Sequence, residues 1–254
     1  MNTVAMSINS RRVAPEIAQL VECASLRTME LFRDVSSSEL ARLAGITRFQ
    51  QVAKRSRIPV LNDGHFSFLM DGLAKVSRLD GSGGETVLYL MKPGESYGVP
   101  VSEYRDDISI IALQPSVVAR VRMRELEQIV GTGKLQAEIS NIRSVRVRQM
   151  EDRLDEMSGR VPARTARILL RLCKEFPKSL QCGTKVNVLL TQQDIASMIG
   201  ATREVTSSTL NVFRRKGWLG IHDRYMCVHN PDELYEASTC AHAVYRSRTG
   251  GGAP

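Results

Sequence analysis

The chain has 254 residues, of which 43% are hydrophobic and 24% are charged. This composition supports a buried core and excludes a disordered chain, and the sequence lacks the run of about 18 apolar residues that a membrane-spanning helix needs. The first twelve residues lack an apolar stretch, so we expect no secretory signal and a cytoplasmic location. The five cysteines are widely scattered, which favours reduced thiols over a disulfide framework.

The positive charge is concentrated in one part of the chain. The formal net charge is +8, from 35 Lys+Arg against 27 Asp+Glu. Between Arg160 and Gly220 there are eleven basic and three acidic residues, so this stretch alone accounts for the whole excess. A basic module beside a neutral one is typical of a nucleic-acid-binding protein. The alternative is a solvated basic surface without a partner.

The N-terminal part predicts two helices. A short helix is expected at Ala14–Cys23, within an N-terminal extension of residues 1–25. Further on, Ser36 and Glu39 form a capping box before an apolar stripe with helical spacing. We expect this second helix to end or bend at Gly45.

Residues 26–123 have the texture of a small antiparallel β structure. Turn signals separate short β-rich runs at roughly ten-residue spacing, and two of them, Asp71-Gly72 and the Gly81–Gly84 cluster, are expected to be hairpin tips. The expected strands are Thr47–Val52, Arg57–Leu61, His65–Met70, Leu73–Leu79, Thr86–Met91, Ile108–Leu113 and Val117–Val121. This pattern predicts a small antiparallel barrel or sandwich.

A long helix is expected over residues 124–158, with a break near Gly131–Gly133. Apolar residues recur along it every three or four positions, which is typical of a seam for a partner helix. The seam consists of Leu135, Ile139, Ile142, Val145, Gln149 or Met150, Leu154 and Met157. We expect a homodimer through residues 135–157. Packing of the helix on its own domain is the alternative.

The C-terminal part, residues 159–235, reads as a winged helix-turn-helix. Helices are expected at Val161–Phe176, Gln192–Ile199 and from Thr202 to about Lys216, the first of them stopped by Pro177. A strand is expected at Lys185–Leu190, and two more flank the tight connection at Asp223-Arg224. In the last helix Val205, Val212 and Phe213 are expected to point inward. Residues 236–254 are expected to form a flexible tail.

The second helix of this motif is the candidate reader of double-stranded DNA. Its N-terminal end is expected to enter the major groove. An arginine there can donate two hydrogen bonds to guanine and a glutamate can accept one from cytosine, while hydroxyls and helix N-termini suit phosphates. The candidate DNA-binding residues are Thr191, Gln192, Thr202, Arg203, Glu204, Ser207, Ser208, Asn211 and Arg214.

Two segments carry a resemblance to a known family. Leu190-Thr191-Gln192-Gln193-Asp194-Ile195-Ala196 and Gly200-Ala201-Thr202-Arg203-Glu204-Val205, behind a β-roll and a long helix, resemble the Crp/Fnr superfamily, the relatives of the cyclic-AMP receptor protein. The resemblance covers about residues 30–235. It implies a homodimeric transcription regulator that binds palindromic promoter sites and contacts RNA polymerase. The family's recognition helix usually carries a second arginine where this chain has Ser208, so the target half-site is expected to differ at that base pair.

The same resemblance argues against cyclic AMP as the effector. In relatives that bind it, a glutamate holds the ribose and an Arg-Ser pair holds the cyclic phosphate. Val99 replaces that glutamate here, and Asp106-Asp107 stands in the place of the Arg-Ser pair, where two carboxylates repel a phosphate. A different ligand, such as a cyclic dinucleotide, a protein partner, or no effector at all remain open. The candidate ligand contacts are Glu95, Tyr97, Arg105 and Gln149.

Other chemistries have weaker signals. No P-loop, zinc-spaced Cys/His set or nucleophile elbow is present, so we expect no catalytic residue, no metal and no cofactor. The thiols are not grouped as an iron–sulfur cluster requires. A redox pair of Cys173 and Cys182, nine residues apart, is conceivable, but a buried Cys173 is favoured.

These expectations combine into an α+β protein. It would have an N-terminal antiparallel β-roll, a long dimerisation helix and a C-terminal winged helix-turn-helix. The expected function is sequence-specific DNA binding in transcription regulation, with ligand-switched DNA binding as the alternative.

Overall fold

The computed structural model describes residues 26–27, 29–60, 63–81, 83–97, 107–180 and 183–239. The expected helix at Ala14–Cys23 lies outside these ranges. The chain divides into two compact units. The first comprises residues 1–74, 91–106 and 110–145, and the second comprises residues 75–90, 107–109 and 146–254.

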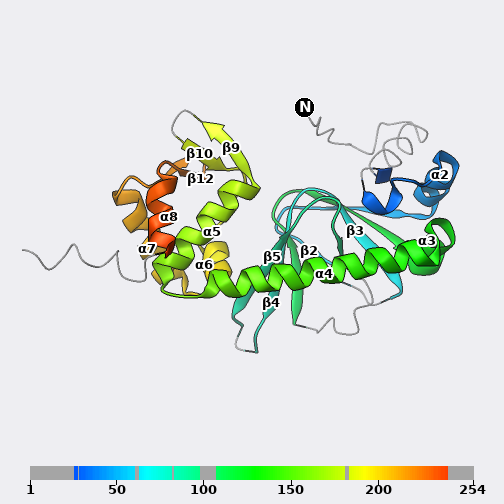
Figure 1. The fold of residues 1–254 in the computed structure, drawn as a ribbon, viewed down its shortest axis with the longest axis horizontal. Coiled ribbons are helices and arrows are strands. Elements are labelled where there is room, and N and C mark those ends of the chain that lie inside the picture. The colour runs from blue at the N-terminus through cyan, green and yellow to red at the C-terminus, as the bar shows by residue number, and fades with distance from the viewer. Residues whose placement is uncertain are drawn as a thin grey trace, which may run out of the picture. The chain divides into compact units, whose positions relative to one another are not determined.

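In the first unit, short helices lie beside a four-stranded antiparallel sheet (Figure 1). The sheet has the order β1-β8-β3-β6. The elements are η1 (Glu30–Phe32), α2 (Ser37–Ile46), β1 (Arg48–Val52), β3 (His65–Asp71), β6 (Ser96–Tyr97), β8 (Ser116–Arg122) and α3 (Met123–Val130). Ser36 and Glu39 form the predicted capping box of α2. The 3-10 helix and β6 were not predicted.

Gly72 fixes the turn after β3. Its φ is +92°, and a Cβ at this position would lie 2.6 Å from the carbonyl oxygen of Pro115. Only glycine fits such a conformation at this distance. A turn at Asp71-Gly72 is therefore confirmed, and its physical reason is a close approach of two backbones. The prediction that it is a hairpin tip is wrong, because the strand that follows Gly72 belongs to a different sheet from β3.

A further sheet has the strand order β2-β7-β4-β5. Its strands are β2 (Arg57–Ile58), β4 (Ala74–Leu79), β5 (Glu85–Met91) and β7 (Ile108–Ala112). The strand expected at Arg57–Leu61 is therefore shorter than predicted. The loop between β4 and β5 is closed by the Asp80 amide, which donates to the Gly84 carbonyl at 2.9 Å, so the predicted hairpin tip is confirmed.

The long helix is divided as predicted. Gly131, with φ +82°, separates α3 from α4 (Thr132–Met157). The early seam residues Leu135 and Ile139 are 1% and 7% exposed, because they join the core of the first unit. The prediction that they face a partner helix is wrong. The apolar side chains of this stretch complete the core beneath the sheet.

The second unit holds the C-terminal helices (Figure 1). They are α5 (Val161–Glu175), α6 (Gln192–Ile199), α7 (Arg203–Arg215) and α8 (Pro231–Thr239), and a sheet of order β11-β12-β10-β9 accompanies them. Its strands are β9 (Pro177–Leu180), β10 (Gly183–Val186), β11 (Leu219–His222) and β12 (Tyr225–Val228). The buried face of α5 includes the predicted Ile168, Leu169 and Leu172.

Two local predictions in this unit are wrong, and one strand was not predicted. Helix α5 ends before Pro177 as expected, and the unpredicted edge strand β9 begins at this residue, where a missing N–H is tolerated. The strand expected at Lys185–Leu190 spans Gly183–Val186 instead. Residues 236–239, expected to belong to a flexible tail, continue α8, where Ala237 is buried.

Candidate nucleic-acid interface

The first helix of the motif, α6, begins with a reciprocal cap. The Asp194 amide donates to the Thr191 hydroxyl at 3.0 Å, and the Thr191 amide donates to Asp194 Oδ2 at 2.8 Å. At the other end, Gly200 adopts the left-handed conformation with φ +60°. The predicted capping box and glycine turn are confirmed. They fix the start and the end of a helix that is only eight residues long.

The second helix, α7, presents a polar outer face. Thr202 caps it by accepting a hydrogen bond from the Val205 amide at 3.3 Å. Helical spacing puts Glu204, Ser208 and Asn211 on one side of the helix, and all three are exposed, as is Arg203. These side chains are available to the edges of base pairs in a major groove.

The remaining candidates flank this face. Ser207 is half-buried, and half-buried Arg214 donates to Asn211 Oδ1 at 3.2 Å. Thr191 is exposed and Gln192 is half-buried at the start of α6. The N-termini of both helices therefore carry accessible polar groups of the type that contacts phosphates.

The inner face of α7 differs from the prediction. Val205 is 47% exposed and Val212 is half-buried, whereas only Phe213 of the three predicted residues is fully buried. Two threonines are buried in their place, because the Thr206 and Thr209 hydroxyls donate to carbonyl oxygens one turn earlier. Such bonds satisfy the hydroxyls inside the helix pair.

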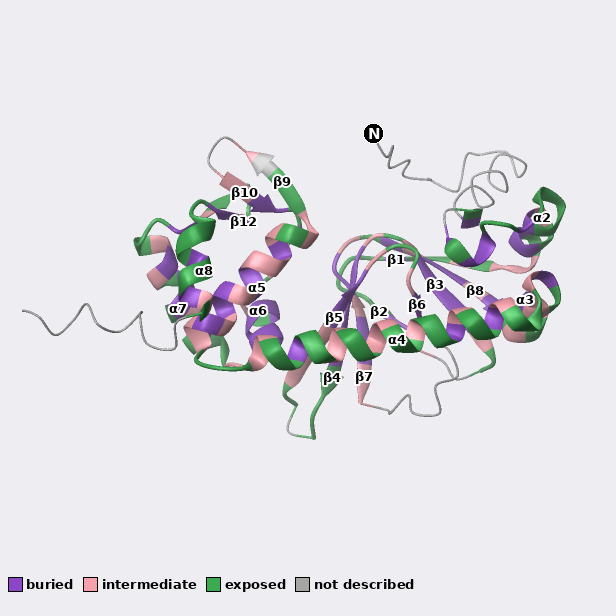
Figure 2. Cartoon of the chain, in the orientation of Figure 1, coloured by how far each residue is buried: buried purple, intermediate pink, exposed green. Residues whose placement is uncertain are grey.

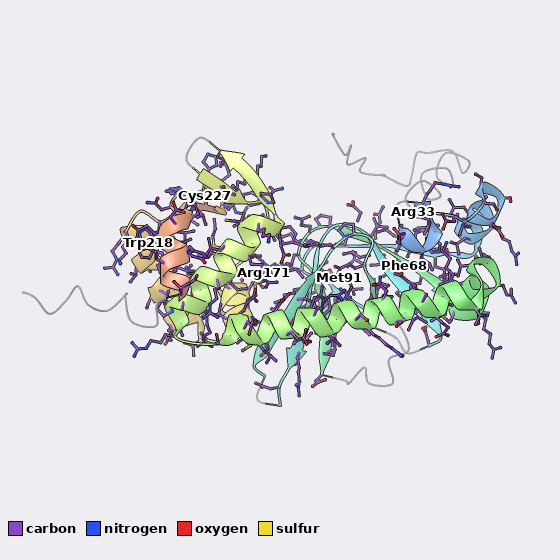
Figure 3. All side chains as sticks on the ribbon, viewed as in Figure 1. Arg33, Phe68, Met91, Arg171, Trp218 and Cys227 are labelled. Carbon is purple, nitrogen blue, oxygen red and sulfur yellow. The ribbon has the colours of Figure 1, made fainter. Side chains whose placement is uncertain are left out.

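Several basic residues of the charged stretch serve the fold instead of a ligand. Arg164 donates to the Ile199 carbonyl at 2.7 Å, and Arg167 donates to the Asp155 and Ser158 carbonyls at the end of α4. Arg171 on α5 (Figure 3) forms an ion pair with Glu156 at 2.5 Å. These three guanidiniums satisfy helix termini and a half-buried carboxylate. Fewer basic side chains are therefore available to DNA than the eleven that the sequence has between Arg160 and Gly220.

The wing, which consists of strands β11 and β12, follows α7 as expected. Asp223 and Arg224 both have positive φ, which is the conformation that joins two strands through a two-residue turn. Trp218 (Figure 3) packs against Phe213 with ring centroids 5.4 Å apart, which anchors the wing to α7. Lys216 lies 4.4 Å from the Trp218 ring centroid in a cation–π contact.

The candidate ligand contacts fall in different units. Glu95 and Tyr97 belong to the first unit, with Tyr97 buried in β6. Gln149 lies in the second unit and accepts a hydrogen bond from Arg146 at 2.8 Å. Arg105 lies outside the described residues, as do Val99 and Asp106.

Within the described ranges, no group of three or more His, Cys, Asp or Glu side chains could hold a metal ion. No helix among those residues is long and apolar enough to cross a membrane. Cys173 and Cys227 are thiols, and Cys227 lies in β12 (Figure 3). Cys182 is outside the described residues. Burial raises the pKa of Cys173 to about 11, which keeps this thiol protonated at neutral pH.

Sequence reasoning missed a set of buried charges in the second unit. Lys75 and Arg153 are each 5% exposed, and Asp194 is 1% exposed. A signal for Lys75 was present, because it stands between the apolar residues Ala74 and Val76 in a strand that is buried on both faces. Lysine is rarely buried unless it is paired.

Comparisons with known proteins agree with this architecture. Residues 163–237 match the model of the Crp-like helix-turn-helix domain. The global nitrogen regulator of Nostoc sp. is 27% identical over 176 residues, which are 66% of this chain and 78% of that protein.

The Crp-family regulator TTHB099 from Thermus thermophilus has the same fold, with a TM-score of 0.64 at 21% identity over 76% of this chain and 97% of the other. The c-di-GMP responsive regulator CLP from Xanthomonas campestris has a TM-score of 0.62 at 16% identity, over 76% and 99%. Residues 163–237 form a Crp-like helix-turn-helix domain, and the fold of the chain is that of Crp-family regulators.

The chain is a bacterial transcription regulator with a DNA-binding helix-turn-helix of the Crp type. The matched domain begins in α5 and ends in α8, so it contains the capped helices, the glycine turn and the wing described above.

Proposed function

We propose that this Crp-like regulator binds a palindromic promoter site as a homodimer, with α7 of each protomer in the major groove. The observation that carries this proposal is the exposed polar face of α7, where Arg203 and Glu204 stand at the capped N-terminus and Asn211 follows two turns later. In this proposal the protein binds DNA in the cytoplasm, and RNA polymerase is the expected protein partner.

The homodimer is supported by the C-terminal half of α4. Figure 2 shows this helix with much of its surface exposed. Val147 and Leu154 are 58% and 72% exposed, and their seven-residue spacing places them on one side of the helix. Two copies of α4 would cover these side chains. The dimer seam therefore lies within residues 146–157 in this proposal.

Cyclic AMP is not the effector in this proposal. Asp107 stands where relatives place a phosphate-binding residue, and its carboxylate forms an ion pair with Arg78 at 2.9 Å. A cyclic phosphate there would be repelled by the Asp107 carboxylate, which also engages the Arg78 guanidinium. Roles for Glu95, Tyr97, Arg105 and Gln149 in binding an effector remain candidates within the proposal.

A second candidate function is control by a cyclic dinucleotide. The Arg146 guanidinium lies 3.9 Å from the centroid of the Tyr89 ring and also holds Gln149. A flat cation stacked on an aromatic ring can receive a base or a phosphate. A structural neighbour is described as c-di-GMP responsive, which adds support for this candidate.

Footprinting on occupied promoters tests the main proposal. The expected footprint is two-fold symmetric, with half-site centres about one helical turn, about 34 Å, apart. Binding that ignores sequence would contradict it. Calorimetry with a panel of mononucleotides and cyclic dinucleotides separates the two candidates, because only the second predicts saturable heat with a cyclic dinucleotide and changed DNA affinity.

A further inference from the structure

A buried ion-pair network joins the β4–β5 hairpin to the helix-turn-helix within the second unit. Lys75 Nζ in β4 lies 2.8 Å from Glu85 Oε2 in β5 and 3.0 Å from Asp194 Oδ1 in α6. The Lys75 side chain is 7% exposed and that of Asp194 is 2% exposed. One ammonium group therefore bridges the hairpin and the first helix of the DNA-binding motif.

Asp194 has two tasks at once. Its Oδ2 accepts hydrogen bonds from the Thr191 amide and hydroxyl at 2.8 and 2.7 Å, while Oδ1 accepts from Lys75. Burial alone raises the pKa of Asp194, but the hydrogen bonds from Thr191 and Lys75 bring this pKa below its ordinary value. The Asp194 carboxylate thus caps the N-terminus of α6 and is also the group through which the β4–β5 hairpin holds this helix.

Arg153 forms a second bridge to the same helix. This buried residue of α4 donates from Nε to the Val87 carbonyl at 3.0 Å and from Nη2 to the Ser197 carbonyl at 3.4 Å. The Ser197 hydroxyl donates to Glu85 Oε2 at 3.4 Å. Two cations, from β4 and α4, therefore fix α6 at its first turn and near its end.

The energetic cost of these charges points to orientation as their role. Removing ions from water is expensive, and buried ion pairs can often be replaced by apolar side chains without loss of stability. Charged pairs require a defined geometry, however, which an apolar contact does not. Since α6 packs on α7 and its Ile195 and Ala196 are buried, fixing α6 also fixes the recognition helix α7.

The network leaves the DNA-reading surface accessible. Arg203, Glu204 and Asn211 are exposed in the same structure in which Lys75 holds Asp194. The bridge is therefore compatible with DNA binding and does not cover the recognition helix.

We propose that Lys75 is a positioning residue for DNA recognition. It holds the helix-turn-helix on the β4–β5 hairpin through Asp194, so that the α7 helices of two protomers have the fixed separation that a two-fold site requires. This inference rests on the proposed homodimeric function. A single half-site needs no fixed separation, so loss of the bridge should affect only the binding of a complete site.

The test compares Lys75→Met with Arg78→Met. Arg78 lies on the same strand, carries the same charge and pairs with Asp107 instead of α6. Full-length protein is titrated with a duplex that holds the complete palindrome and with one in which a half-site is scrambled. For Lys75→Met the expected result is a loss of affinity of about 5- to 50-fold on the palindrome, in the range of typical coupling energies, and a change below about twofold on the half-site. Arg78→Met and Lys75→Arg should bind both duplexes like the wild type.

Each variant is first checked by thermal unfolding. A ratio of palindrome to half-site affinity that stays at the wild-type value in Lys75→Met overturns the proposal, whether both affinities are unchanged or both fall equally. If Lys75→Met does not fold, the neutral pair Lys75→Gln with Glu85→Gln takes its place and must show the same selective loss. If the wild type itself does not prefer the palindrome, the homodimer proposal fails as well, which distinguishes the two failures.

Discussion

The Arg164 guanidinium donates to the carbonyl oxygen of Ile199, the last residue of α6, at 2.7 Å, and contacts the next carbonyl, that of Gly200, at 3.3 Å. Carbonyls at a helix C-terminus have no partner within the helix, and a cation there also interacts favourably with the helix dipole. Arg164 is thus a structural cap of the helix-turn-helix, although its charge contributes to the basic stretch of the sequence.

This relationship separates stability from DNA affinity. Arg164→Ala is expected to lower the free energy of unfolding by about 1–3 kcal/mol, because carbonyls lose a charged donor. The slope of log affinity against log salt concentration should stay as in the wild type. In Arg215→Ala, an exposed residue of α7, stability should be unchanged and the slope should fall by about one phosphate contact. Urea unfolding measures the stability, and DNA titration at several salt concentrations measures the slope. A reduced slope without loss of stability in Arg164→Ala would contradict the structural role of this residue.

Arg203 is expected to read one base pair. In Arg203→Ala, discrimination at one position of the half-site should fall by about 1–3 kcal/mol, while other positions keep their preference. Binding selection from a randomised half-site gives the per-position preferences. Ser208→Arg is the matched gain-of-contact variant and should add a guanine preference at a neighbouring pair. An unaltered preference profile in Arg203→Ala would remove this residue from the reading face.

Val205 offers an apolar surface beside the polar reading face. An exposed apolar side chain at the start of a recognition helix can contact the methyl group of thymine. Replacing one thymine by uracil removes only that methyl group and should cost the wild type about 0.8 kcal/mol, a fourfold loss of affinity. Val205→Ser should not respond to the same replacement. The measurement replaces each thymine of the half-site by uracil in turn. If the wild type binds all of these duplexes with equal affinity, the contact is disproved.

The charge of Asp194 should make stability depend on pH. Because the folded-state pKa of Asp194 lies below its ordinary value of 3.8, its contribution is present above that value and is lost as the pH falls through the folded pKa. Asp194→Asn is expected to lower the free energy of unfolding by about 1–3 kcal/mol at pH 7. The difference from the wild type should shrink below about pH 4. Urea unfolding between pH 3 and pH 7 checks this, and a difference that grows in acid would show the opposite sign.

The Cys173 thiol should react slowly with alkylating agents. With its pKa raised to about 11 from 9.0 by burial and by Cys227, the thiolate fraction at pH 8 falls about a hundredfold, and alkylation slows accordingly. Peptide mapping by mass spectrometry after timed iodoacetamide treatment measures the rate at this cysteine. Urea-unfolded protein is the control and should react at the ordinary rate. Fast alkylation in the folded state would restore the hypothesis of a redox-active residue.

The sequence predicted those parts of the fold that depend on local chemistry. The capping boxes at Ser36 and Thr191, the glycine turns at Gly72 and Gly200, and the two-residue turn at Asp223 all follow from short-range hydrogen bonds and backbone conformation. Helical spacing also identified most of the exposed face of α7.

Long-range packing explains what could not be predicted. Helical period alone does not tell a partner helix from the core of the same unit, so Leu135 and Ile139 were assigned to the wrong surface. Val205 was expected to be buried, but it is exposed and its neighbour Thr206 is buried instead. The Thr206 hydroxyl is satisfied by a carbonyl one turn earlier, which hydrophobicity does not reveal. The bridge from Lys75 to Asp194 joins residues 119 positions apart, and no local pattern reports such a pair.

The exposed Val147 and Leu154 of α4 have a consequence for the amount of regulator in the cell. A homodimer covers these side chains only in the folded state, so association stabilises folding by mass action and the melting temperature rises with protein concentration. A scarce regulator would then be both less dimeric and more easily unfolded and degraded. Protein abundance would in this way act as an input to gene control, independent of any effector.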